Sequence, residues 1–109
     1  MKNLNVGLLG GGSWGTTVAS LVARNVPATL WARNPATVEE INTHHTNNVF
    51  LPGATLPEKL VATTDIEKAV HDADVIVMGI PSQNFREVLQ EVKKHIRAWV
   101  PVISLTKGL

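Results

Sequence analysis

Six residues near the amino terminus form a glycine-rich segment of the kind that binds phosphate. Residues 10–15 read Gly-Gly-Gly-Ser-Trp-Gly and fit the pattern G-x-G-x-x-G. In this pattern Gly10 permits a tight turn, Gly12 lets the backbone approach a pyrophosphate, and Gly15 allows a helix to pack close to a strand. The free N–H groups and the positive dipole end of that helix favour a bound diphosphate. The alternative is a glycine-rich turn without a ligand. A strand before the turn and a helix after it favour the dinucleotide site.

The residue after the second predicted strand selects between the two nicotinamide dinucleotides. Sites that prefer NAD place Asp or Glu there to bind the ribose 2′-hydroxyl. This chain has no acidic residue from Thr16 to Val38 and offers Arg33 instead. Arg33 could pair with a 2′-phosphate and lie over the adenine, whereas the alternative is a solvated surface charge. The sequence therefore favours NADP, with NADPH as the reduced form, or tolerance of NAD as well.

Two further positions follow predicted strands at their carboxyl ends, where open α/β sheets bind ligands. Lys107 could attract a substrate phosphate, or stabilise negative charge on a carbonyl oxygen during hydride attack. The alternative for Lys107 is a solvated lysine near the chain end. Pro81 and Ser82 form a turn that could line the nicotinamide side of the site. Ser82 is expected first of all to cap the next helix.

These residues act together only if strands and helices bring them to one edge of a sheet. Short apolar runs predict strands, and apolar residues at helical spacing predict helices between them. We expect strands at 4–9, 28–32, 60–63, 74–80 and 101–105, helices at 14–25, 34–45, 65–70 and 85–96, and a loop over 46–59. This alternation predicts an α/β fold of the Rossmann type, with a doubly wound, mainly parallel sheet truncated after about five strands. The last strand is expected to lie at an open edge of the sheet.

Length and composition are those of a single globular domain spanning residues 1–109. The chain has 10 Lys and Arg against 9 Asp and Glu, a net charge of +1, and 44% hydrophobic residues. These values exclude a disordered chain and weaken any role in nucleic-acid binding, which needs a concentrated basic patch. No apolar run approaches the roughly 20 residues of a membrane span, and no signal peptide is recognisable, so we expect a cytoplasmic protein.

The composition also argues against metal and thiol chemistry. With no cysteine in the chain, a disulfide, a cysteine zinc site, an iron–sulfur cluster and a thiol nucleophile are all excluded. His44 and His45 are adjacent, so on a helix they point about 100° apart and suit shared ligation poorly. His71 and His95 stand alone. We therefore expect no metal site.

Six blocks of sequence together resemble a known family, the bacterial NAD(P)-dependent glycerol-3-phosphate dehydrogenases. They occur in the family's order, at about its spacing, and span the whole chain. The blocks are Gly10–Thr16, Leu30–Arg33, Asn48–Gly53, Ala62–Asp65, Pro81–Arg86 and Ser104–Leu109.

The resemblance implies a fold, an activity and a missing part. Such enzymes reduce dihydroxyacetone phosphate to sn-glycerol 3-phosphate with NAD(P)H, for phospholipid synthesis. They pair an amino-terminal dinucleotide domain with a carboxy-terminal helical domain, which carries much of the substrate site and the lysine that acts as acid and base. The resemblance therefore implies that this chain is the amino-terminal part, binding cofactor without turnover. A homodimer is one possible assembly of the full-length enzyme.

The resemblance also implies roles for single residues. Ser13 and Trp14 match positions that contact the cofactor at the glycine-rich turn, and Arg33 matches the position near the adenosine ribose. Lys107 matches a lysine that reaches both cofactor and substrate. Phe50 is a departure, because the family often has Tyr before Leu-Pro-Gly. A polar contact there would be lost, while packing of the ring against the cofactor could persist.

Two other functions are compatible with the residues. One is a non-catalytic regulatory module that binds NAD(P). The other is a different enzyme with a similar cofactor domain, such as a hydroxyacid or ketopantoate reductase. The blocks at 51–53 and 106–108 argue against the second.

Overall fold

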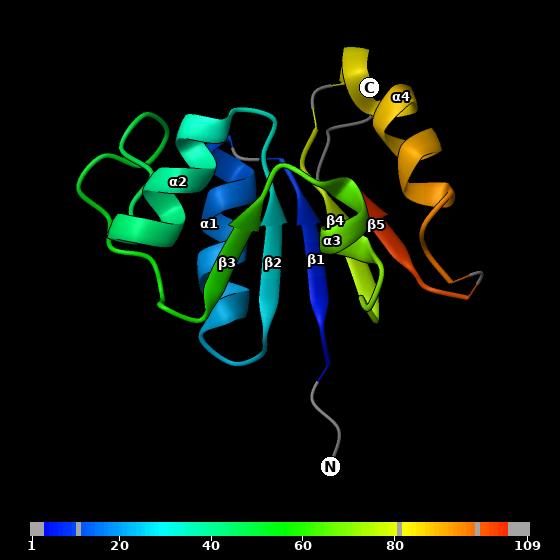
Figure 1. The fold of residues 1–109 in the computed structure, drawn as a ribbon, viewed down its shortest axis with the longest axis horizontal. Helices are drawn as coiled ribbons and strands as arrows, with labels where there is room; N and C mark the ends of the chain where they lie inside the picture. The colour runs from blue at the N-terminus through cyan, green and yellow to red at the C-terminus, as the bar shows by residue number, and fades with distance from the viewer. Residues whose placement is uncertain (1–3, 11, 81, 98, 105–109) are drawn as a thin grey trace.

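A computed structural model describes residues 4–10, 12–80, 82–97 and 99–104, with only the backbone of Ser13, Trp14 and Ser82. Strands and helices alternate along this part of the chain (Figure 1). The elements are β1 (Val6–Leu9), α1 (Ser13–Ala23), β2 (Ala28–Trp31), α2 (Pro35–His44), β3 (Leu60–Thr63), α3 (Ile66–Val70), β4 (Val75–Met78), α4 (Ser82–Lys93) and β5 (Val102–Ser104). Every predicted strand and helix is present, so the α/β prediction is confirmed.

The strands form one parallel sheet in the order β3-β2-β1-β4-β5. Leu8 in the central strand pairs with Leu30 on one side and with Val77 on the other. Chain order runs outward from β1 in both directions, which creates a topological switch point between β1 and β4. This is the strand order of a doubly wound dinucleotide-binding sheet through its fifth strand. The arrowheads in Figure 1 show that the carboxyl ends of the strands lie along one edge.

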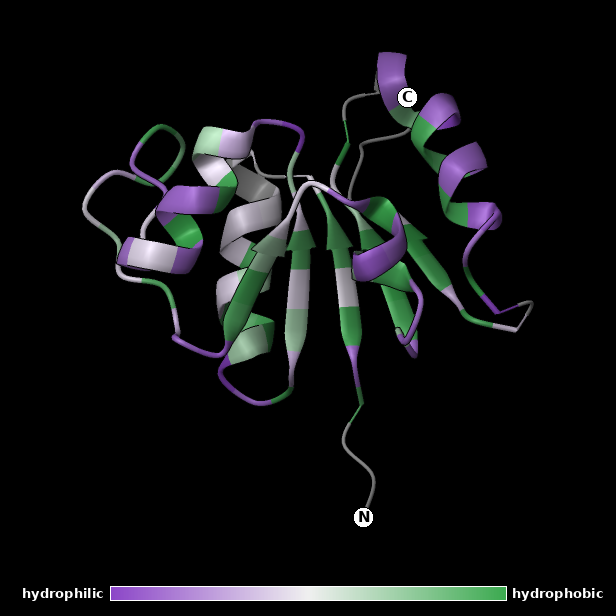
Figure 2. Ribbon diagram, viewed as in Figure 1, coloured by the Kyte–Doolittle hydropathy of each residue, from purple (hydrophilic) through white to green (hydrophobic). Residues whose placement is uncertain are grey.

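Helices cover the sheet on both faces and create two apolar layers. Alternate residues of one strand enter different layers. Leu8 belongs to the same core cluster as Ile41 of α2, and Leu9 to the same cluster as Val88 and Val92 of α4. Figure 2 shows the strands mostly green and purple segments on α2, α3 and α4. Continuous apolar strands are expected where both faces are covered.

The beginnings of two helices follow from local side-chain chemistry. Asn34 Oδ1 accepts a hydrogen bond from the N–H of Ala36 at 2.9 Å, at the start of α2. Asp65 Oδ1 accepts from the N–H of Glu67 at 3.0 Å, at the start of α3. Side-chain caps of this kind satisfy amide donors that a helix leaves without partners. Both capping residues stand at the first position of a helix range predicted from the sequence, at 34 and 65.

Most elements differ from their predicted ranges by one to three residues at one or both ends. Helix α4 covers Ser82–Lys93, about one turn earlier than the predicted range of 85–96. Ile96 still packs against the α4 side of the core, because a turn after the helix directs it there. The last strand, β5, has only three residues, and all of them are exposed. It lies at the edge of the sheet, as predicted.

No helix in the described ranges is long and apolar enough to cross a membrane.

Candidate dinucleotide-binding site

The ends of the central strands are joined at the carboxyl edge by backbone hydrogen bonds. The N–H of Gly10 donates to the carbonyl of Trp31 at 2.8 Å, so the turn after β1 is fixed to the end of β2. The N–H of Gly79 donates to the carbonyl of Leu9 at 2.8 Å, so the turn after β4 is fixed to β1. The three turns therefore emerge side by side at the switch point, where sheets of this class bind their ligands.

The three glycines of the motif have different steric environments. Gly10 has a φ of +118°, and a Cβ atom there would lie 2.5 Å from the carbonyl oxygen of Gly79. A Cβ atom on Gly15 would overlap the carbonyl oxygen of Gly10. Around Gly12, no described atom lies within 4 Å of where a Cβ would be. Contacts inside the protein thus require glycine at positions 10 and 15, whereas no described residue requires it at position 12.

Helix α1 presents its amino-terminal end at this turn. Gly12 is its N-cap and supplies no side-chain cap, and no acidic residue lies in the first turn. Regular helical hydrogen bonding begins at this residue, because the N–H of Thr16 donates to the carbonyl of Gly12 at 2.9 Å. No carboxylate of the first turn offsets the positive end of the helix dipole, which suits an anionic ligand.

Arg33 lies beyond the end of β2, exposed to solvent. The central carbon of its guanidinium lies 5.7 Å from the ring centroid of Trp31, within range of a cation–π contact. The Trp31 ring is held in turn, since its Nε1 donates to the carbonyl of Thr64 at 2.8 Å. The neighbouring Asn34 side chain caps α2. In the described part of the chain, no ion pair joins Arg33 to a carboxylate. The guanidinium is therefore available at this edge.

The long connection between α2 and β3 returns to the first turn of α1. Asn47 is only 1% exposed, and its Nδ2 donates to Thr16 Oγ1 at 2.9 Å. The N–H of Leu51 donates to the carbonyl of Asn47 at 2.7 Å and closes a turn that contains Phe50, which is 44% exposed. The structure thus brings the Phe50 segment next to the glycine-rich turn. Asn47 was not a predicted site residue, because an asparagine in a polar loop indicates only a turn.

Several predicted positions lie outside the described residues. They are Pro81 and Lys107 as whole residues, and the side chains of Ser13 and Trp14. In the sequence Pro81 follows β4, which ends at Met78, and Lys107 follows β5, which ends at Ser104. Both strands end at the carboxyl edge of the sheet.

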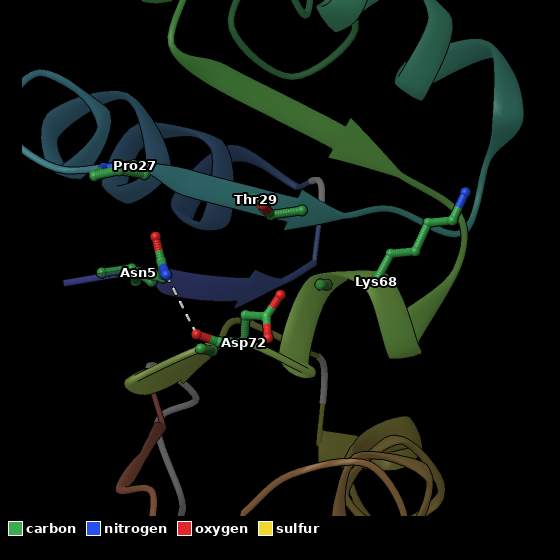
Figure 3. A pocket seen from close by; sticks show the side chains of 8 residues that line it. Asn5, Pro27, Thr29, Lys68 and Asp72 are labelled. Atoms are coloured by element: carbon green, nitrogen blue, oxygen red, sulfur yellow. Dashed lines mark hydrogen bonds between the residues drawn. The ribbon is translucent and has the colours of Figure 1, made fainter. Parts of the chain in front are cut away.

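A cavity of about 180 Å³ lies elsewhere, near the amino ends of β1 and β2 and beside the end of α3. Figure 3 shows Asn5, Pro27, Thr29, Lys68 and Asp72 around it. The side-chain amide of Asn5 donates to the carbonyl of Asp72 at 3.4 Å across its margin. This cavity is at the opposite end of the strands from the glycine-rich turn. Among the described residues, no group of three or more His, Asp or Glu could hold a metal ion.

A family model described as the N-terminus of NAD-dependent glycerol-3-phosphate dehydrogenase matches residues 5–109. The chain belongs to this family. Glycerol-3-phosphate dehydrogenase (NAD(P)+) 2 of Sphingopyxis alaskensis is 63% identical over 106 residues, which are 97% of this chain and 32% of that protein. Glycerol-3-phosphate dehydrogenase (NAD(P)+) 1 of Mycobacterium bovis is 52% identical over 103 residues, which are 94% of this chain and 30% of that protein.

A solved structure gives the same result. Glycerol-3-phosphate dehydrogenase from Saccharomyces cerevisiae superposes with a TM-score of 0.89 at 37% identity, over 98% of this chain and 34% of that one. The chain therefore spans about a third of the length of its curated relatives. The resemblance seen in the six sequence blocks is confirmed. Neither a regulatory module nor a different reductase gains support from these relatives.

Proposed function

We propose that residues 1–109 are the NAD(P)-binding domain of an enzyme that reduces dihydroxyacetone phosphate to sn-glycerol 3-phosphate. The observation that carries the proposal is the contrast within the glycine-rich turn. Gly10 and Gly15 are required by contacts inside the protein, whereas no described residue occupies the space beside Gly12. A glycine next to open space at a helix N-terminus fits a backbone that must approach a pyrophosphate.

Each remaining residue of the site has a proposed role in binding or orienting the cofactor. Ser13 and Trp14 contact the cofactor at the start of α1. Pro81 lines the nicotinamide side, and the ring of Phe50 packs against the dinucleotide. Arg33 receives the adenosine ribose, and with no acidic residue after β2 the 2′-phosphate of NADPH is favoured over the hydroxyl of NADH.

The cofactor supplies the hydride, and this chain holds and orients it. Lys107 contributes a cation that attracts the substrate phosphate or stabilises the carbonyl oxygen as it becomes negative. We propose that the lysine that acts as acid and base lies in a carboxy-terminal helical domain, since this chain spans only about a third of the length of its relatives. The chain by itself thus binds cofactor without turnover. We further propose that the full-length enzyme is a cytoplasmic homodimer.

Titration of the chain with NADPH and NADH, followed by tryptophan fluorescence, tests this function. We expect saturable binding, tighter for NADPH. We expect an Arg33→Ala variant to lose roughly 10- to 100-fold in affinity for NADPH but little for NADH, because one charge-assisted contact to phosphate contributes roughly 1.5–3 kcal/mol. Arg24→Ala is the matched control, since it removes the same charge at the far end of α1. A folded chain that binds neither cofactor would contradict the proposal.

A further inference from the structure

The segment that carries Phe50 is fixed by a polar contact in the interior of the protein. Asn47 is 1% exposed and Thr16 is fully buried, and the two side chains are joined at 2.9 Å although they lie 31 residues apart. Buried amides and hydroxyls are costly unless they are hydrogen-bonded, so this contact strongly specifies where the segment lies. It ties residue 47 to the first turn of α1, one turn from Gly12.

Glu40 of α2 holds the same segment on both sides of Asn47. Its Oε2 accepts from the hydroxyl of Thr46 at 2.7 Å and from the N–H of Asn48 at 2.9 Å. The turn is then closed by the bond from the N–H of Leu51 to the carbonyl of Asn47. Backbone and side-chain bonds together thus define the conformation of residues 46–51.

Phe50 lies within this fixed turn and is nevertheless 44% exposed. A large aromatic side chain held at the surface by a rigid turn is preorganised, because a ligand that covers it does not have to order the backbone first. The turn is anchored beside the helix end at which the pyrophosphate is proposed to lie. An aromatic ring can pack against a flat, partly apolar dinucleotide there without a phenolic hydroxyl.

We infer that Asn47 is a positioning residue of the cofactor site. By bonding to Thr16 it fixes the 46–51 turn to the first turn of α1, and so holds Phe50 against the bound dinucleotide. This inference rests on the proposed function and deepens it, since it adds a loop determinant of affinity to the glycine-rich turn. Asn47 itself does not need to touch the cofactor.

The first test uses the chain without cofactor, by hydrogen exchange of the amides in residues 46–54. Asn47→Ala and Thr16→Val both remove the contact, and we expect exchange in this segment to become about five- to tenfold faster, which corresponds to the loss of one hydrogen bond. Thr16→Ser keeps the hydroxyl and is expected to exchange like the unmodified chain. Thr16→Val changes the size of the side chain very little, so this variant tests the inference if Asn47→Ala does not fold. Unchanged exchange in the folded Thr16→Val variant would overturn the inference.

The second test asks whether Asn47 acts through Phe50. NADPH titrations are made with Asn47→Ala, with Phe50→Ala and with both changes, at a temperature where circular dichroism shows every variant folded. We expect Asn47→Ala to weaken NADPH binding about fivefold in the unmodified chain, the effect of one hydrogen bond, and to have no further effect when Phe50 is already absent.

The outcomes separate the inference from the function on which it rests. Equal weakening by Asn47→Ala in both backgrounds, or none in either, would overturn the inference alone, because binding would then be independent of the link between Asn47 and Phe50. Absence of saturable NADPH binding by the folded, unmodified chain would overturn the proposed function and the inference with it.

Discussion

Gly12 differs from the other two glycines of the motif because no contact with a described residue requires it to lack a side chain. A Cβ atom at Gly12 would meet no described atom within 4 Å, whereas at Gly15 it would overlap the carbonyl oxygen of Gly10. Substitutions at these two positions should therefore affect different properties of the protein. One should change ligand binding, and the other should change folding.

For Gly12→Ala we expect at least a tenfold loss of NADPH affinity, because the methyl group occupies space that the pyrophosphate needs. The free energy of unfolding should fall by no more than about 1 kcal/mol, the usual cost of alanine at an N-cap. Gly15→Ala should instead lower it by about 1–3 kcal/mol, because the helix must move away from the turn. Urea unfolding and NADPH titration of both variants measure the two effects. Equal destabilisation by both variants would contradict this assignment.

At the scale of elements, Glu40 makes the link between α2 and the 46–51 turn dependent on pH. The hydrogen bonds from the Thr46 hydroxyl and the Asn48 N–H lower the pKa of Glu40 below its ordinary 4.5, with a smaller contribution from His44. A carboxyl group whose pKa is lower in the folded chain than in the unfolded chain stabilises the fold. This stabilisation is complete at pH values above the group's pKa in the unfolded chain, and it is lost as the pH falls through the group's pKa in the folded chain. The anchor of this turn is thus complete at neutral pH and weakens in acid.

Glu40→Gln should therefore be less stable than the unmodified chain at pH 7, and the difference should shrink as the pH falls below about 4.5. Urea unfolding between pH 3 and pH 7 measures it. Glu39→Gln is the control, because it removes a neighbouring charge on the exposed side of α2. A stability difference for Glu40→Gln that is constant with pH would show that the carboxylate's charge does not strengthen these bonds.

Local sequence predicts elements well where local chemistry decides them. The strand at 60–63 has the observed bounds, and the caps at Asn34 and Asp65 are present, because each depends on residues a few positions apart. The turn at 46–51 was predicted only as part of a loop. Its position depends on the contact between Asn47 and Thr16, which lie 31 residues apart, and no local pattern reports such a contact. The same reason explains why Gly12 was predicted as a site residue and Asn47 was not.

At the scale of the whole molecule, one ionic cluster ties together segments from both ends of the chain. Arg97 donates to the carbonyl of Ala73 and, at 3.1 Å, to Asp74 Oδ1. The other oxygen of Asp74 accepts from the N–H of Asn5 at 2.9 Å. The Asp74 side chain is only 13% exposed, so these partners supply contacts that water would otherwise make. The cluster joins the starts of β1 and β4 to the segment before β5.

Arg97→Ala should lower the free energy of unfolding by about 1–3 kcal/mol, because a mostly buried carboxylate loses its charged partner. NADPH affinity should not change, since the cluster lies at the amino ends of the strands. Lys93→Ala, which removes an exposed charge near the end of α4, is the matched control. Thermal unfolding and NADPH titration distinguish the two effects. A stable Arg97→Ala variant with weakened NADPH binding would contradict this role.

The central position of β1 has a consequence for the order of folding. Val6 in β1 pairs with Val75 in β4, so the two strands must meet across an intervening stretch of more than sixty residues. Contacts this distant in sequence slow folding, because the chain entropy of closing the loop is lost before any pairing compensates for it. Gly79, which closes one side of the glycine-rich turn, lies beyond that late-pairing strand. The glycine-rich turn is therefore complete only when β4 has docked, and a ligand of that site can stabilise the finished sheet but cannot assist its early steps.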